Sequence, residues 1–346
     1  MLPHFLVVIG ASAGGTQPLI ELVSRLPADF PAAVCIATHI PAYAPSHLPE
    51  ILSHAGPLPA VHPMDGDPLE PGCIYCAPPD HHLLIEDGRH QVTKGHKENR
   101  ARPAIDPLFR SAAYSEGPGI IGVVLSGMLD DGTSGLWTIA RFGGTTVIQD
   151  PREAEFNSMP QSALDQVRID HVTSIQDLAE LLQHLVSQPP QDQLPLAVTE
   201  AERARVGIEI SIARRDNAFR KGVMDFGKVT PQTCPECGGV LVQIKEGGFT
   251  RYRCHTGHAY TGDTLLVSVT ENVEETLWKT MRVLEEASML LENTGQELEA
   301  TGQSRLAAAY ERKAREIEQR TRLIFEQVQD SEELSHEQLV QDTTPE

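Results

Sequence analysis

Apolar residues in the first half of the chain gather in short runs, and these runs alternate with stretches of helical periodicity. The runs are FLVVI, AAVCIAT, CIYCA, IIGVVL and TTVIQ, and the first helix-like stretch is QPLIELVSRL. Strands and helices in alternation form a mostly parallel sheet that is covered by helices on both faces. The pattern therefore predicts a doubly wound α/β domain over residues 1–187.

The segment LLIEDGRHQV has the pattern of a β-hairpin. Asp87-Gly88 stands at its centre, and these residue types readily adopt the positive φ angles that a tight hairpin turn requires. We expect this hairpin to give the otherwise parallel sheet one antiparallel excursion.

Two apolar stripes in the last third of the chain have three- and four-residue spacing, which is typical of amphipathic helices. Gly302 separates the stripes. We predict an antiparallel helical hairpin over residues 262–330, followed by a flexible acidic tail over residues 331–346. The stripe residues are Leu266, Val269, Val273, Leu277, Met281, Leu284, Leu291, Leu306, Tyr310, Ile317, Ile324 and Val328.

The middle of the chain is expected to contain a linker and a small module. Residues 188–195 (QPPQDQLP) are rich in proline and polar residues, and a short helical pattern follows. We assign residues 188–230 to a linker with a short helix, and residues 231–261 to a zinc-binding module.

Length, charge and cysteine usage narrow the class of protein. A chain of 346 residues is long enough for more than one folded unit. The net charge of −20 argues against a nucleic-acid partner, because no concentrated basic patch is present. No apolar run reaches the roughly 20 residues of a spanning helix, and the start lacks a signal-peptide pattern. Together with six cysteines that suit a reducing compartment, this predicts a cytoplasmic protein that is not inserted in a membrane.

A candidate nucleophile lies between the first strand and the first helix. Gly10-Ala11-Ser12-Ala13-Gly14 matches the G-x-S-x-G turn that exposes a serine at a helix N-terminus, where amide N–H groups can stabilise an oxyanion. The alternative is a glycine loop that binds phosphate. That alternative is less favoured, because the glycine spacing differs from the phosphate-binding motifs and no lysine follows.

Two further residues have positions that fit a serine hydrolase. His39 ends the strand AVCIAT and Asp131 follows the strand IIGVVL, so both emerge at the edge of the sheet where Ser12 lies. A serine hydroxyl needs a base to take its proton, and a carboxylate holds that imidazole in one tautomer. Taken singly, His39 and Asp131 are more simply explained as loop residues.

At this point the chain resembles the catalytic domain of the chemotaxis protein-glutamate methylesterase family, over roughly residues 4–186. The similar stretches are IGASAGG, ATHIP, YCAPPDHHLLI, RPAIDPLFRSAA, VVLSGMLDDGTSGL and QDPREAEFNSMP. The resemblance implies that Ser12, His39 and Asp131, rather than Asp130, form the catalytic triad. It also implies that the backbone N–H of Met128 is the oxyanion donor.

The resemblance further implies a reaction and a partner. Ser12 would attack a glutamyl methyl ester on a helix of a methylated chemoreceptor or related signalling protein, methanol would leave, and water would release the enzyme. Some members of the family also deamidate glutamine.

The chain departs from the family pattern at two points. Ala13 replaces a threonine that many members carry. The catalytic strand starts at Phe5, so we expect no preceding receiver domain and no phosphorylation control of that kind.

The cysteine-rich segment has the spacing of a structural zinc site. Cys234 and Cys237 form one ligand pair, and Cys254 and His258 follow after a gap typical of such sites. His255 is an alternative ligand, although its place directly beside Cys254 makes joint ligation less comfortable. A redox Cys-x-x-Cys pair is the other interpretation. We expect structural zinc here, and no cofactor for catalysis.

Three classes of function remain after the sequence is considered. The first is the methylesterase, which docks to a helical receptor or forms a homodimer through its C-terminal hairpin. The second is a catalytically idle receptor-binding or scaffold protein with a zinc module. The third keeps the serine chemistry but acts on another acyl ester or a glutaminyl amide.

Overall fold

The computed structural model describes residues 5–188 and 198–329. It divides into two compact units, one that ends at Leu265 and one that begins at Leu266. The predicted acidic tail and all but the first residue of QPPQDQLP lie outside the described residues. The boundaries predicted within the first unit stay a prediction.

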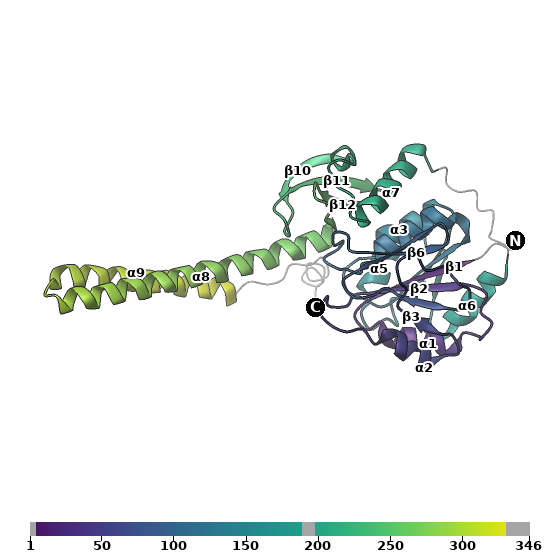
Figure 1. Ribbon diagram of the computed structural model, residues 1–346, viewed down its shortest axis with the longest axis horizontal. Helices are drawn as coiled ribbons and strands as arrows, with labels where there is room; N and C mark the ends of the chain where they lie inside the picture. The colour runs from purple at the N-terminus through teal and green to yellow at the C-terminus, as the bar shows by residue number, and fades with distance from the viewer. Residues whose placement is uncertain (1–4, 189–197, 330–346) are drawn as a thin grey trace, which may run out of the picture. The chain divides into compact units, whose positions relative to one another are not determined.

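A parallel β-sheet forms the centre of the first unit (Figure 1). Its strand order is β3-β4-β2-β1-β7-β8-β9, and every neighbouring pair is parallel. The doubly wound α/β fold predicted from the alternating pattern is therefore confirmed. The strands are β1 (Leu6–Ala11), β2 (Ala33–Thr38), β3 (Ala60–Val61), β4 (Ile74–Cys76), β7 (Ile120–Val124), β8 (Thr145–Gln149) and β9 (His171–Thr173).

Helices cover both faces of this sheet, and each face has its own apolar core (Figure 1). Side chains of a strand alternate between faces, so Val7 and Ile9 of β1 enter one core while Leu6 and Val8 enter the other. The first core is covered by α1 (Thr16–Arg25), α2 (Leu48–Ala55) and α6 (Ile175–Ser187). The second is covered by α3 (Ile105–Glu116), α4 (Thr133–Arg141), α5 (Ser158–Gln166) and α7 (Glu200–Ala213).

The predicted hairpin exists, but its predicted place in the main sheet was wrong. Strands β5 (His82–Glu86) and β6 (Arg89–Thr93) form a separate two-stranded sheet, with Asp87 and Gly88 at φ angles of 48° and 68°. Its buried side chains pack with those of α3, and the Ile85 amide donates to Ser111 Oγ of that helix at 3.0 Å. Because the apolar face of the hairpin is buried against α3, the hairpin lies in the helical layer and not in the main sheet.

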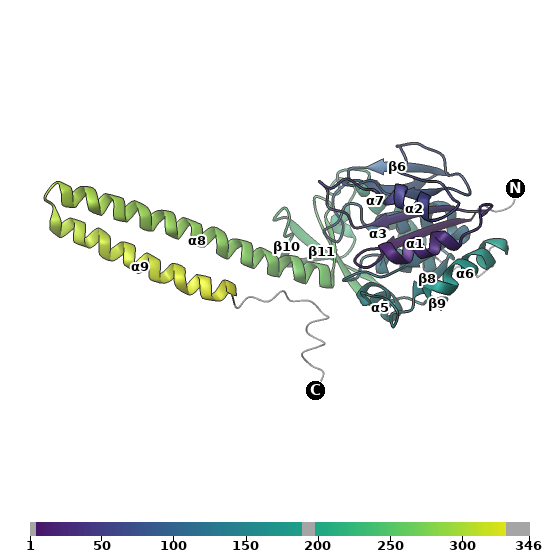
Figure 2. The ribbon, with the colours of Figure 1, turned by 90° about the horizontal axis from the view of Figure 1, so that it is seen from below.

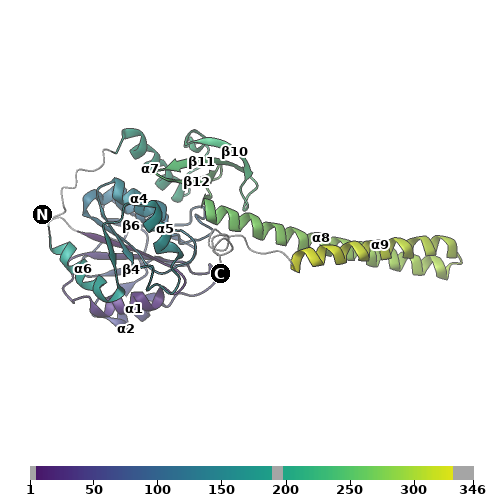
Figure 3. The same cartoon turned by 180° about the vertical axis from the view of Figure 1, so that it is seen from behind.

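A second, antiparallel sheet belongs to the same unit, beside α7 (Figure 3). Its strands are β10 (Lys228–Thr233), β11 (Val240–Glu246), β12 (Phe249–Cys254) and β13 (Ala259–Thr261), in that order. The segments η1 (Gly117–Gly119) and η2 (Val223–Asp225) are short 3₁₀ helices.

Buried ion pairs attach this second sheet to the helices of the first. Arg253 of β12 lies 2.6 Å from Glu98, which also lies 3.1 Å from Arg110 of α3. Glu209 of α7 pairs with Arg110 at 3.1 Å and with Arg251 at 2.9 Å. All five side chains are at most 2% exposed. Charges removed from water in this way are tolerated only when they are paired, so the cluster fixes the elements relative to one another.

The second unit is a helical hairpin, as predicted (Figure 2). It comprises most of α8 (Gly262–Ala300), together with α9 (Ser304–Gln329), and Gly302 in the turn has a φ angle of 79°. Ser288 and Ala314 meet between the helices, where Ser288 Oγ donates to the Ala314 carbonyl at 3.3 Å. Among the helices of residues 5–188 and 198–329, none is long and apolar enough to cross a membrane.

Candidate active site and metal centre

Ser12 lies in the tight turn between β1 and α1, which is the local structure that its flanking glycines predict. Gly14 has a φ angle of 68°, a conformation that L side chains rarely adopt. The Ser12 amide donates to the Ser126 carbonyl at 2.9 Å. The turn is therefore anchored to the segment that follows β7.

The structure brings Ser12, His39 and Asp131 into one chain of hydrogen bonds. Ser12 Oγ lies 3.0 Å from His39 Nδ1, and His39 Nε2 lies 2.7 Å from Asp131 Oδ2. The hydrogen bond to Asp131 favours the tautomer that carries its proton on Nε2. In that tautomer the lone pair of Nδ1 faces the serine hydroxyl. The arrangement can accept the proton of Ser12. The catalytic roles of the three residues stay a prediction.

Asp131 is almost completely buried, yet its carboxylate is surrounded by donors. Oδ2 accepts from the Ile105 amide at 2.7 Å, and Oδ1 accepts from Asn99 Nδ2 at 2.9 Å. Burial by itself raises the pKa of Asp131, but the hydrogen bond and charge of His39, with these N–H groups, hold the pKa below its ordinary value. Asp131 is thus ionised beside the imidazole at neutral pH.

Asp106 and Asn99 adjoin this carboxylate, and sequence reasoning gave neither of them a role. Asp106 Oδ1 accepts from the Gly132 amide at 3.1 Å and from the Gly135 amide at 2.7 Å. Burial first, and then the charge of Asp131, raise the pKa of Asp106 well above its ordinary value. Asp106 stands in the stretch RPAIDPLFRSAA, where a charged residue among the apolar residues of the helix start was the available signal.

The segment after β7 lies against Ser12. A Cβ atom on Gly127 would lie 2.9 Å from Ser12 Cβ and only 2.0 Å from Met159 Sδ, so a side chain cannot be accommodated there. Met128 follows directly, and among the described residues its N–H has no hydrogen-bond partner. This amide can serve as an oxyanion donor, although that role stays a prediction.

Ser126 joins three loops around the candidate nucleophile, and it was not predicted. Its Oγ donates to the Ala13 carbonyl at 2.8 Å and accepts from the Phe156 amide at 3.0 Å. The two turns beside Ser12 are therefore fixed to each other by one buried hydroxyl.

The predicted zinc ligands also converge. One ligand atom from each of Cys234, Cys237, Cys254 and His258 lies within 4.8 Å of every other. Cys237 Sγ is 3.8 Å from Cys254 Sγ, and His258 Nδ1 is 3.7 Å from Cys234 Sγ. With zinc–sulfur bonds of about 2.3 Å, the edge of a tetrahedron is about 3.8 Å. The four residues fit a metal ion of that geometry.

The surroundings of the cluster distinguish the two histidines. His258 Nε2, on the far side of the ring from the sulfurs, lies 3.4 Å from Glu236 Oε2, a typical outer partner of a metal-ligating imidazole. Thr256 Oγ1 lies 2.8 Å from Cys254 Sγ. The His255 ring instead packs against Gly239, and His255 is outside the group of converging ligand atoms.

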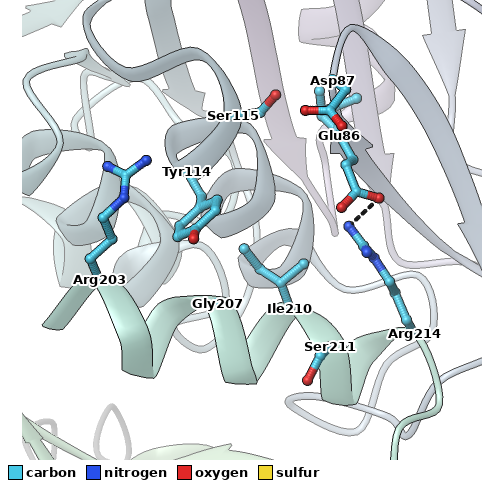
Figure 4. Close-up of a pocket in the computed structure, with 10 residues that line it drawn as sticks. Glu86, Asp87, Tyr114, Ser115, Arg203, Gly207, Ile210, Ser211 and Arg214 are labelled. Atoms are coloured by element: carbon cyan, nitrogen blue, oxygen red, sulfur yellow. Dashed lines mark ion pairs between the residues drawn. The ribbon is translucent and has the colours of Figure 1, made fainter. Parts of the chain in front are cut away.

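A hollow of about 350 Å³ lies between α7, α3 and the β5–β6 turn (Figure 4). The guanidinium of Arg203 stacks 4.7 Å from the Tyr114 ring, and Arg214 pairs with Glu86 at 2.6 Å. None of Ser12, His39 and Asp131 lines this hollow. It is separate from the candidate active site.

The part of the chain that contains this site is similar to known proteins. The family model described as CheB methylesterase matches residues 7–182. A putative protein-glutamate methylesterase/protein-glutamine glutaminase of Leptospira interrogans is 36% identical over 176 residues, which are 51% of this chain and 91% of that protein. Protein-glutamate methylesterase/protein-glutamine glutaminase 1 of Xanthomonas campestris is 36% identical over 187 residues, and the match covers 53% of this chain and 52% of that protein.

A solved structure shares the fold of the same region. The crystal structure of the Thermotoga maritima CheB methylesterase catalytic domain superposes with a TM-score of 0.51 and 32% sequence identity, covering 53% of this chain and 98% of that one. The matched region contains Ser12, His39 and Asp131, whereas the second sheet and the helical hairpin lie beyond it. The chain therefore belongs to the CheB methylesterase family, a family of carboxylic ester hydrolases.

Proposed function

We propose that this protein hydrolyses glutamyl methyl esters on chemoreceptor-type signalling proteins, with Ser12, His39 and Asp131 as its catalytic triad. The observation that carries the proposal is the unbroken chain of hydrogen bonds from Ser12 Oγ through His39 to Asp131. The printed names of the relatives, protein-glutamate methylesterase/protein-glutamine glutaminase, support the substrate.

The first half of the reaction forms an acyl-enzyme. His39 Nδ1 takes the hydroxyl proton while Ser12 Oγ attacks the ester carbonyl carbon. The negative charge of Asp131 stabilises the imidazolium, and the Met128 N–H donates to the oxyanion. When the tetrahedral intermediate collapses, the carbon–oxygen bond to the methoxy group breaks, and methanol leaves with the proton from His39.

The second half restores the enzyme. His39 removes a proton from water, the resulting hydroxide adds to the acyl carbon, and Ser12 Oγ leaves with that proton. The product is a glutamate carboxylate. A glutaminyl amide can follow the same path with ammonia as the leaving group, and we propose it as a second substrate.

The test compares Ser12→Ala with Ser24→Ala in the full chain. Ser24 is an exposed serine of α1 that bonds only locally, to the Glu21 carbonyl. Each variant is incubated with methyl-labelled receptor helices and with a generic ester. Ser12→Ala should lower methanol release by about 10⁴-fold or more, and Ser24→Ala should leave it unchanged.

Each outcome of this test has a meaning. Methanol release from the receptor that persists in Ser12→Ala would end the serine mechanism. A wild-type protein that binds receptor helices but releases no methanol would favour the scaffold alternative. Release from the generic ester alone would move the substrate to another acyl ester.

We further propose that Cys234, Cys237, Cys254 and His258 hold a structural zinc ion. The near-tetrahedral spacing of their ligand atoms supports this. Zinc content should be about one ion per chain in the wild type and should fall in Cys237→Ser, while Cys73→Ser, outside the cluster, should keep it. Equal zinc content in both variants would contradict the assignment.

Finally, we propose that the helical hairpin docks to the helical signalling partner. Leu290 on α8 and Leu323 on α9 are more than 60% exposed, although both are strongly apolar. Leu290→Glu with Leu323→Glu should weaken receptor affinity and leave hydrolysis of a generic ester intact. Unchanged affinity with a changed oligomeric state would assign this surface to a second copy of the chain instead.

A further inference from the structure

Asn99 connects the candidate catalytic carboxylate to the second sheet. Its Nδ2 donates to Asp131 Oδ1 at 2.9 Å and to Asp106 Oδ2 at 3.0 Å. Its Oδ1 accepts from the Thr261 amide of β13 at 3.1 Å. The side chain therefore uses both of its donors and its acceptor, and it is buried.

The backbone of Asn99 is fixed to the same strand. Its amide donates to the Ala259 carbonyl at 2.9 Å, and its φ angle is 49°, a left-handed conformation that asparagine tolerates better than most residues. Asn99 is thus held by β13 on one side while it holds Asp131 on the other.

The candidate metal centre is the immediate neighbour of this contact along the chain. His258 directly precedes β13, and the Cys254 amide donates to the His258 carbonyl at 2.9 Å. The turn that carries two of the proposed zinc ligands therefore fixes where β13 begins. Only two residues separate His258 from Thr261, whose amide bonds Asn99.

A parallel set of contacts holds the residue beside Asp131. The hydroxyl groups of Thr261 and Thr264 donate to Asp130 Oδ1 at 2.7 Å and 3.1 Å. Asp130 lies between Met128, the proposed oxyanion donor, and Asp131, the proposed catalytic carboxylate. Thr261 at the end of β13 and Thr264 in the first turn of α8 therefore hold the side chain of Asp130, which directly precedes Asp131.

We propose that Asn99 is a positioning residue through which the sheet β10–β13, with its Cys/His cluster, orients the catalytic carboxylate Asp131. The inference rests on the proposed function, because it takes Asp131 as the residue that orients His39. The inference goes beyond that function, because it assigns the sheet β10–β13 an effect on the rate of ester hydrolysis.

The first experiment changes the Asn99 side chain with little change in shape. Asn99→Asp keeps the acceptor for the Thr261 amide but replaces the two donors with an oxygen that faces Asp131. Asn99→Ala removes all three side-chain contacts. The control is Asn217→Ala, because Asn217 is exposed and its side chain accepts only from the Arg220 amide.

Both Asn99 variants should lower kcat for a methyl ester by about 10- to 100-fold with KM within about twofold of the wild type. The control should match the wild type. A kcat within about twofold of the wild type in folded Asn99→Asp would overturn the proposal, as would a loss carried by KM alone.

The second experiment tests the link to the metal centre with a readout other than activity. Amide hydrogen exchange is measured at Ile105, Asp106 and Gly132, whose N–H groups bond the carboxylates of Asp131 or Asp106. In a chain that retains Asn99, either Cys237→Ser or zinc chelation should increase exchange at these amides and lower kcat. In Asn99→Asp, exchange should already be fast, and Cys237→Ser should lower kcat by less than it does in the wild type.

Loss of protection confined to β12 and β13, with these three amides and kcat unaffected, would overturn the coupling. A failure of the proposed function would look different. In that case Ser12→Ala would retain turnover, whatever the Asn99 variants do.

Discussion

At the end of β7, adjacent carboxyl groups have opposite protonation behaviour because their neighbours differ. Asp131 faces an imidazole and several N–H donors, which lower its pKa. For Asp130, burial raises the pKa to about 7; the charges of Asp263 and Asp131 add to the rise, and the hydroxyl groups of Thr261 and Thr264 oppose it. The choice of Asp131 over Asp130 rested on a family pattern, and these contacts supply a physical reason for it.

The raised pKa of Asp130 predicts a pH-dependent stability. A carboxyl whose pKa is higher in the folded protein stabilises it below the ordinary pKa, and this contribution is lost as the pH rises through about 7. Asp130→Asn, which keeps an acceptor for Thr261 and Thr264, should therefore stabilise the protein at pH 8 by roughly 1–4 kcal/mol and by less at pH 5. Urea unfolding at both pH values measures the difference. A pH-independent difference would contradict the prediction.

Asp131→Asn should separate folding from catalysis. An asparagine amide facing His39 favours the wrong imidazole tautomer, so turnover of a methyl ester should fall by about 10³- to 10⁴-fold. Circular dichroism should show a folded protein. Turnover within about tenfold of the wild type would mean that Asp131 does not orient His39.

At the scale of helices and strands, hydrophobic periodicity predicted which elements form but did not predict which elements they pack against. The runs around Val7 and Val123 became the expected strands, because a strand covered on both faces is apolar throughout. The β5–β6 hairpin was recognisable from Asp87-Gly88. Its packing on α3 was not, since an apolar hairpin face fits a helix as well as a sheet edge.

The buried ion cluster was also beyond sequence reasoning. Arg251 and Arg253 stand two residues apart and so share one face of β12, which was the available signal. Their partners come from distant segments: Arg253 and Glu98 are 155 residues apart in the sequence. Local spacing cannot reveal such pairs.

Removal of one charge from this cluster should be costly. Glu209→Gln leaves Arg110 and Arg251 without a full counter-charge in a buried site, so the free energy of unfolding should fall by about 3–5 kcal/mol. Glu200→Gln, in the exposed first turn of the same helix, is the control. Chemical denaturation measures both, and equal stability of the two variants would show that the cluster contributes little.

At the scale of the whole molecule, the sequence indicated the order of parts, namely an α/β domain, a cysteine-rich segment and a helical hairpin. The sequence pattern predicted that the cysteine-rich segment is a separate module that follows a linker. In the structure, that segment and α7 belong to the compact unit that ends at Leu265. Composition marks where a chain is polar, but it does not tell whether the next segment folds back onto the previous one.

This organisation predicts how truncated chains behave. A chain that ends at Ser187 lacks Glu209 and Arg253, the partners of Arg110 and Glu98. Its Tm should lie about 10 °C below that of a chain that ends at Leu265. Differential scanning calorimetry of the two chains is the measurement, and equal Tm values would mean that residues up to 187 are stable without the second sheet.

The contacts of Asn99 bear on chemical ageing. Spontaneous deamidation turns asparagine into aspartate, and at this position it would produce a side chain that repels the carboxylate it now holds. The burial and the three hydrogen bonds that give Asn99 its place also restrain its amide and keep water away from it. The contacts of Asn99 make the site sensitive to replacement of the amide nitrogen by oxygen. The same contacts therefore slow deamidation, the spontaneous reaction that makes this replacement.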